Sequence, residues 1–156
     1  MAKRLSLLVD TDIFIDYFNH RVFRDFFEDR AFGIYYSVVT KKELLSKKGL
    51  TLAERKNIIS FLKKYRLIPL NREILKKYSE HRQKHPSAGK EDCLIAATAV
   101  VKKFPLVTRN YRHYRIFRDL KLYFDQLVKD RPFFGMSKKN RKSVSDQMKS
   151  LRGHRI

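Results

Sequence analysis

The sequence predicts an α/β fold with three layers, in which helices cover both faces of a central parallel sheet. Short apolar runs alternate along the chain with longer segments whose apolar residues recur at helical spacing. Such alternation is typical of parallel strands joined by helices. The first apolar run, residues 5–9, ends at Asp10, as a buried strand does when its carboxyl end opens into a site.

The first half of the chain is expected to supply two strands and three helices. A helix with an acidic start is predicted over residues 12–18, and a second helical stretch over residues 22–29. Residues 33–38 are rich in β-branched and aromatic side chains, which favour a strand. Thr40 is then expected to cap the helix that contains Glu43.

The second half continues the alternation. Residues 51–65 have apolar side chains at helical spacing, and they precede a short strand at residues 67–70 that Pro69 assigns to a sheet edge. Asn71 is expected to cap the next helix. The remaining elements are a helix at residues 91–103 and strands at residues 106–108 and 120–124.

The chain is strongly basic, with 36 Lys and Arg residues against 16 Asp and Glu residues and a formal net charge of +20. A field of this size favours a polyanionic partner such as RNA, DNA or an anionic membrane surface. Residues 125–156 carry nine basic and three acidic side chains, so +14 of the +20 belongs to residues 1–124. We therefore expect a basic folded domain over residues 1–124, followed by a basic extension that is mobile or binds a partner.

Membrane association and disulfide chemistry are both expected to be absent. No apolar run approaches the roughly 20 residues that cross a bilayer, and the amino end has no signal-like segment. The single cysteine, Cys93, stands in an apolar run and is expected to be a buried thiol rather than a nucleophile. These features predict a cytoplasmic protein.

Three acids are expected to converge at one edge of the sheet. Asp10 ends the first strand, Glu43 lies early in the helix after the second strand, and Asp92 lies near the start of a later helix. Ligands of such sheets bind beyond the carboxyl ends of the strands. Carboxylates crowded there repel one another unless a cation neutralises them, and hard oxygen ligands select Mg²⁺ or Mn²⁺. Such ions support hydrolysis of phosphodiesters.

Four stretches in order then resemble the PIN-domain toxins of the VapC type. They are Leu-Leu-Val-Asp10-Thr-Asp-Ile-Phe-Ile-Asp, Ser37-Val-Val-Thr-Lys-Lys-Glu43-Leu-Leu, Glu91-Asp92-Cys-Leu-Ile-Ala-Ala-Thr-Ala and Leu106-Val-Thr-Arg-Asn110-Tyr-Arg-His-Tyr. The resemblance covers about residues 5–124. It implies sheet order 3-2-1-4-5, Mg²⁺- or Mn²⁺-dependent endoribonuclease activity on RNA and a cognate antitoxin. It also makes Asp10, Glu43 and Asp92 the metal-binding acids, supported by Thr108.

The sequence departs from the family pattern at two positions. Asn110 stands where a fourth acid is expected, which predicts one cation or a weaker second one. Asp12 stands where relatives often have Asn or Ser, and it is interpreted either as holding a metal-bound water or as capping a helix. His113 and Tyr114 are expected to pack and form hydrogen bonds rather than take part in the chemistry.

Two other functions remain open from the residues. Asp10-Thr11-Asp12 after an apolar strand also fits a haloacid-dehalogenase-like phosphatase, although Glu91-Asp92 opens a helix where that family needs an acidic pair closing a strand. Alternatively, Asn110 is the first sign of decay in a non-catalytic RNA-binding protein on a degenerate PIN scaffold. A homodimer is also expected, from the resemblance and from the aromatic-rich segment Phe23 to Phe32.

Overall fold

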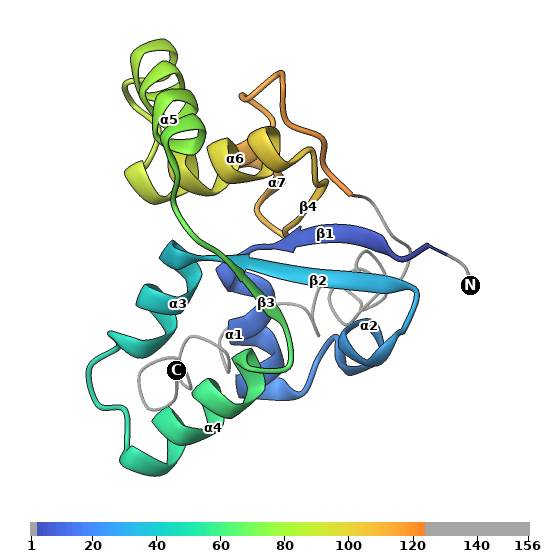
Figure 1. Ribbon diagram of the computed structural model, residues 1–156. Helices are drawn as coiled ribbons and strands as arrows, with labels where there is room; N and C mark the ends of the chain where they lie inside the picture. The colour runs from blue at the N-terminus through green and yellow to red at the C-terminus, as the bar shows by residue number, and fades with distance from the viewer. Residues whose placement is uncertain (1–2, 124–156) are drawn as a thin grey trace, which may run out of the picture.

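Helices and strands alternate along the chain as a parallel sheet requires (Figure 1). The structure is a computed structural model that describes residues 3–123. The strands are β1 (Leu5–Val9), β2 (Phe32–Ser37), β3 (Arg66–Ile68) and β4 (Leu106–Val107). The helices are α1 (Thr11–His20), α2 (Arg24–Glu28), α3 (Val38–Leu45), α4 (Leu52–Leu62), α5 (Arg72–Lys84), α6 (Lys90–Lys102) and α7 (Tyr111–Tyr114).

The sheet has the order β3-β2-β1-β4, and every pair of strands is parallel. This confirms the predicted fold class and places β3 at an edge, as Pro69 indicates. The expected fifth strand is reduced to one parallel bridge, in which Leu122 pairs with Leu106 beside β4. Because β4 has only two residues, it offers little edge to pair with, and two backbone hydrogen bonds hold the bridge.

Strand β1 lies in the middle of the sheet and contributes to two separate cores. Successive side chains of a strand point to opposite faces. Leu7 and Val9 therefore pack in the core beneath α1, α2 and α4, whereas Leu8 packs in the core beneath α5 and α6 (Figure 1). All three side chains are fully buried. This arrangement fixes the end of β1, where Asp10 follows.

The aromatic segment from Phe23 to Phe32 is largely inside the molecule. Phe23, Phe26 and Phe27 are 2%, 1% and 5% exposed, and Phe27 lies 5.2 Å from the ring centroid of Phe14 on α1. These rings therefore fill the core of one chain and are not available to pair two chains. The homodimer remains a prediction that rests on the resemblance alone.

The helix caps agree with the sequence at one position and differ at another. Asn71 caps α5 as expected, with its side chain accepting a hydrogen bond of 2.9 Å from the backbone N–H of Ile74. Thr40 does not cap α3; the N-cap is Ser37, whose hydroxyl accepts from the N–H of Thr40 at 3.2 Å. The strand predicted over residues 33–38 extends one residue too far, since Val38 is already the first residue of α3.

Three further expectations concern membrane-spanning helices, the single cysteine and the carboxyl-terminal extension. Within the described residues, no helix is long and apolar enough to cross a membrane. Cys93 is a buried free thiol, as its apolar context predicts. The expected basic extension over residues 125–156 lies outside the described residues, and the domain boundary at residue 124 remains a prediction.

Candidate active site

The three acids singled out in the sequence lie together at the carboxyl ends of the strands. Asp10 follows β1 and is the N-cap of α1, Glu43 lies on α3 after β2, and Asp92 lies in the first turn of α6. They share one cleft of about 690 Å³. Its other lining residues are Thr11, Asp12, Ile15, Ser46, Lys47, Glu91, Asn110 and His113.

Asp10 is the most enclosed of these acids, with 7% of its surface exposed. Its Oδ1 accepts from the N–H of Thr11 at 2.8 Å and from the hydroxyl of Tyr114 at 3.2 Å. Its Oδ2 accepts from the hydroxyl of Thr108 at 2.8 Å. Burial raises the pKa of Asp10, and the charge of Asp92 adds to the rise, although the hydrogen bonds oppose it.

Asp92 and Asn110 are linked through His113. Oδ2 of Asp92 lies 3.2 Å from Nδ1 of His113, and the same ring nitrogen lies 2.8 Å from Nδ2 of Asn110. The backbone N–H of Asn110 donates to the hydroxyl oxygen of Thr108 at 3.0 Å. Asn110 therefore lines the cleft beside the acids and also fixes the threonine that binds Asp10.

Glu43 also lines the cleft and is the exposed member of the three acids. Its Oε1 accepts from the hydroxyl of Thr11 at 3.4 Å, and that hydroxyl lies 2.9 Å from the hydroxyl of Thr40. Partial burial, followed by the charge of Asp10, raises the pKa of Glu43 to about 7. A proton or a cation therefore relieves the repulsion at this position.

Asp12 does not cap the helix, because Asp10 occupies the N-cap position. Oδ2 of Asp12 accepts from the backbone N–H of Arg109 at 3.0 Å, which ties α1 to the segment after β4. Its Oδ1 is buried and has no hydrogen-bond partner among the described residues. Burial and the charge of Asp10 raise its pKa well above the ordinary value. The capping interpretation is wrong, and Oδ1 remains an unsatisfied hydrogen-bond acceptor beside the other acids.

Comparison with known proteins places this arrangement in a family. Residues 7–118 match the PIN domain. This chain belongs to the PIN-domain family. The match includes Asp10, Glu43, Asp92 and Asn110, and it runs from within β1 through β4.

The relatives of this PIN domain are named as VapC ribonucleases. The chain is 33% identical over 124 residues to Ribonuclease VapC10 of Mycobacterium tuberculosis, covering 74% of this chain and 90% of the relative. It is 27% identical over 125 residues to Ribonuclease VapC1 of Methanocaldococcus jannaschii, covering 76% and 87%. The expected membership among VapC-type PIN domains is thereby confirmed.

Solved structures show the same fold. DNA-bound VapBC from Salmonella typhimurium has a TM-score of 0.68 at 19% identity, covering 76% of this chain and 97% of that chain. VapBC2 from Rickettsia felis, bound to a promoter DNA fragment, has a TM-score of 0.65 at 22% identity, covering 76% and 98%.

Three residues of the PIN-domain site were not singled out as functional in the sequence. Tyr114 is fully buried, and its hydroxyl lies 3.2 Å from both Asp10 Oδ1 and Asp92 Oδ1. Arg109 forms a salt bridge with Asp16, which is completely buried on α1. The only sequence signal is that Asp16, Arg109 and Tyr114 lie inside the motifs around Asp10 and Asn110.

The donor set of this PIN domain suits a hard divalent cation. Its carboxylate oxygens are ligands that Mg²⁺ and Mn²⁺ prefer, and burial together with neighbouring acidic charge raises the pKa values of Asp10, Asp12 and Glu43, a cost that a bound cation would offset. Within residues 3–123, no three ligating side chains already stand close enough together to enclose an ion. A bound cation would therefore draw on waters as well as on the acids.

Proposed function

We propose that this chain is a Mg²⁺- or Mn²⁺-dependent endoribonuclease that hydrolyses RNA phosphodiesters and acts as the toxin of a toxin–antitoxin pair. The observation that carries the proposal is the gathering of Asp10, Glu43 and Asp92 in one cleft of a PIN domain. The names of its VapC relatives support ribonuclease activity.

Asp10, Glu43 and Asp92 would hold the cation in this cleft. When bound, the cation would make an attacking water more acidic and stabilise charge on the leaving oxygen. The unpartnered Oδ1 of Asp12 supports a role for this residue in holding a water beside the ion. Asn110 contributes a neutral amide, so the proposal includes a single firmly held cation.

The surrounding hydroxyls would orient the acids. Thr108 binds one oxygen of Asp10, and Thr11 binds Glu43 from the first residue of α1. The hydroxyl of Tyr114 lies between Asp10 and Asp92. Because these donors come from different elements, they fix the carboxylates before substrate arrives, and preorganisation of this kind lowers the barrier.

The alternative functions fit less well. A haloacid-dehalogenase-like phosphatase needs an acidic pair that closes a strand, whereas Glu91 and Asp92 lie in the first turn of α6. The family match also favours a PIN domain over a haloacid-dehalogenase-like enzyme. A degenerate, non-catalytic RNA-binding scaffold would not need three acids kept in one cleft, where burial and neighbouring charge raise the pKa values of Asp10 and Glu43.

The proposed partners follow from the relatives. VapBC structures are the neighbours in fold, which supports a cognate antitoxin for this chain. The net charge of +20 supports RNA as the polyanionic substrate. The proposal also includes a homodimer and a cytoplasmic location, where cellular RNA is encountered.

Cleavage of total RNA by the purified protein tests the proposed activity. Cleavage should occur with Mn²⁺ or Mg²⁺, stop with a chelator and disappear in Asp92→Asn. Cleavage that persists in a chelator would overturn metal dependence, and equal cleavage by Asp92→Asn would overturn the site. Co-expression with the product of a neighbouring small reading frame tests the toxin role, since a cognate antitoxin should restore growth.

A further inference from the structure

The cleft that holds the acids is poorly suited to attract RNA by itself. Its lining contains one lysine, Lys47, and the carboxylates Asp10, Asp12, Glu43, Glu91 and Asp92. Phosphates approach such a cleft against like charge, and one bound divalent cation offsets only part of that charge. The chain nevertheless carries a net charge of +20. The attraction for RNA must therefore come from basic side chains outside the cleft.

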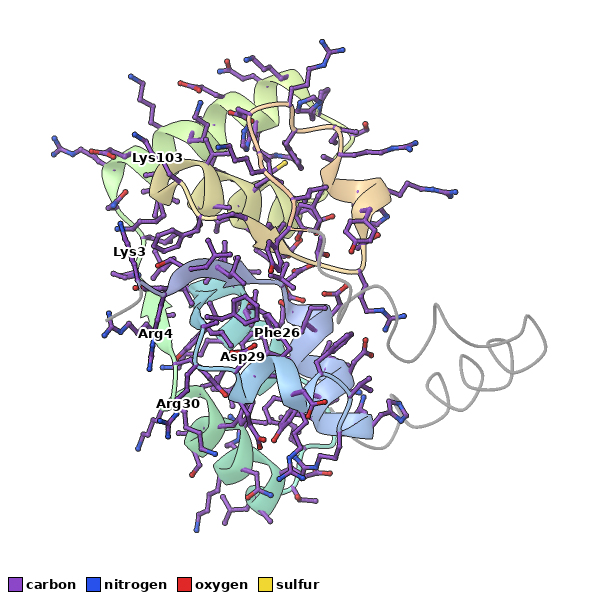
Figure 2. All side chains as sticks on the ribbon, turned by 90° about the vertical axis from the view of Figure 1, so that its right-hand side faces the viewer. Lys3, Arg4, Phe26, Asp29, Arg30 and Lys103 are labelled. Carbon is purple, nitrogen blue, oxygen red and sulfur yellow. The ribbon has the colours of Figure 1, made fainter. Side chains whose placement is uncertain are left out.

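A basic recess lies at the opposite end of the sheet from the acids, at the amino ends of the strands. It has a volume of about 290 Å³, and its cationic lining residues are Arg4, Arg30, Lys64 and Arg66. Arg4 precedes β1, Arg30 precedes β2, and Lys64 and Arg66 lie at the start of β3. Figure 2, viewed from this side, shows Arg4 and Arg30 along one edge of the molecule, with Lys3 and Lys103 following the same edge.

The acids of the recess are already engaged. Asp29 accepts a hydrogen bond of 2.8 Å from the backbone N–H of Ala31, and Glu28 forms a salt bridge of 3.0 Å with Arg24. No carboxylate among residues 3–123 forms a salt bridge with any of the four cations of the recess. Their charges are therefore available to an anion.

Arg66 is oriented by an aromatic side chain instead of an acid. Its Nη1 donates to the hydroxyl of Tyr35 at 3.5 Å, and its guanidinium carbon lies 6.0 Å from the centre of the Tyr35 ring. A guanidinium held in this way keeps N–H donors free, and its planar fork matches a phosphate better than an ammonium does.

We propose that the recess formed by Arg4, Arg30, Lys64 and Arg66 binds backbone phosphates of the RNA whose scissile bond lies in the acidic cleft. The inference rests on the proposed ribonuclease function. The six residues of β2 run from the recess to the start of α3, roughly 20 Å at the usual rise per residue. An RNA several nucleotides long is needed to reach both places, so the recess would favour longer RNA.

The triple variant Arg4→Gln, Arg30→Gln, Arg66→Gln tests the recess in the full-length chain. Its affinity for a single-stranded RNA of about 30 nucleotides is measured with chelator present, so that cleavage does not interfere, and at several salt concentrations. Affinity should fall about tenfold or more, and the slope of log affinity against log salt should flatten by about 2 if three phosphate contacts are lost. The same measurement with DNA of equal length and sequence identifies the nucleic acid.

The matched control removes three exposed cations from α5 on the other side of the sheet: Arg72→Gln, Lys76→Gln, Lys84→Gln. It loses the same charge and should weaken RNA binding less than about threefold. Equal losses in the two triple variants would overturn the recess, because the effect would then be net charge alone. A loss seen with DNA and not with RNA would overturn it as well.

Two further readouts keep the test decisive. The triple variant could melt far below the parent, and the single variant Arg30→Gln, at an exposed position, then replaces it. This single change should flatten the slope of log affinity against log salt by about 0.7. An unchanged slope would overturn the proposal. Cleavage by the parent with Mn²⁺ is assayed in parallel. If the parent binds RNA through the recess but does not cleave it, the proposed nuclease function is wrong, and the recess remains an RNA-binding site.

Discussion

The hydroxyl of Tyr114 donates to Oδ1 of Asp10 at 3.2 Å from a side chain with no exposed surface. The same hydroxyl lies 3.2 Å from Oδ1 of Asp92. One phenolic proton cannot bind both acids fully, so Tyr114 couples the positions of the two carboxylates. Burial and both charges raise the pKa of Tyr114, and the hydroxyl keeps its proton as a donor.

Tyr114→Phe should therefore reduce RNA cleavage while preserving the core. A hydrogen bond to a charged group is worth about 1.5–3 kcal/mol, which corresponds to roughly tenfold or more in kcat/KM if the acids lose their alignment. The check is cleavage kinetics beside thermal unfolding. Tyr78→Phe on α5 is the control, since Tyr78 lies away from the cleft. Equal kinetics in both variants would contradict the positioning role.

Asp10→Asn should abolish cleavage yet leave the metal-free protein as stable as the parent or more stable. Burial and Asp92 disfavour the charged form of Asp10, so a neutral amide of the same size relieves that cost. Thermal unfolding in a chelator and cleavage with Mn²⁺ measure the two effects. Glu73→Gln, an exposed change on α5, should alter neither. A large loss of metal-free stability in Asp10→Asn would indicate a structural role instead.

The stability of the metal-free protein should fall as pH rises between about 4.5 and about 7. The pKa of Glu43 is raised from 4.5 to about 7, so the folded state binds its proton more tightly than the unfolded state. This contribution is complete below pH 4.5 and is lost as pH passes 7. Because Glu43 is exposed, water screens the effect and the change should be small.

Melting temperatures at pH 5 and pH 8 in a chelator, for the parent and for Glu43→Gln, measure this contribution. The variant should show the smaller decrease. With Mn²⁺ the trend should reverse, because the cation binds the deprotonated acid. An identical pH dependence in the two proteins would contradict the raised pKa.

Replacing Arg109 should destabilise the fold far more than replacing an exposed arginine. Arg109 pairs with Asp16, whose side chain is completely buried, whereas the Arg24–Glu28 pair is 67% and 61% exposed. Removing one partner of a buried pair costs about 3–5 kcal/mol, but an exposed pair contributes about 0–1 kcal/mol. Urea unfolding of Arg109→Gln and Arg24→Gln should separate them, and similar values would contradict the buried role.

The sequence was sufficient to predict which acids converge. Asp10 follows β1 and Asp92 lies in the first turn of α6, and parallel strands bring such positions to one end of the sheet. Glu43 lies on α3 after β2 as expected, but it is the sixth of the eight helix residues and not early in the helix. Apart from Thr108, which the resemblance implies as a support of the site, the partners of these acids depend on tertiary packing and were not predicted. Tyr114 reaches Asp10 across 104 positions of the chain, and nothing in its local pattern specifies that contact.

Local patterns also left some boundaries and partners unresolved. Ser37 and Thr40 are both hydroxyl residues near the start of the same helix, and only the backbone conformation shows that Ser37 is the cap and Thr40 lies within the helix. Thr40 instead contacts the hydroxyl of Thr11 beside Glu43. The fifth strand was overpredicted because its apolar residues cannot reveal that β4 is two residues long.

The central position of β1 has a kinetic consequence. Its neighbours β2 and β4 bond to it on both sides, and the amide of Asp10 donates to the carbonyl of Val107 at 2.9 Å. Leu7 and Leu8 lie in different cores, so neither core can open without disturbing the same strand. Amide hydrogens of Leu8 and Asp10 should exchange with solvent only through global unfolding. Asp10 is thus attached to the part of the described chain that is expected to open last, and local fraying elsewhere would leave this acid in place.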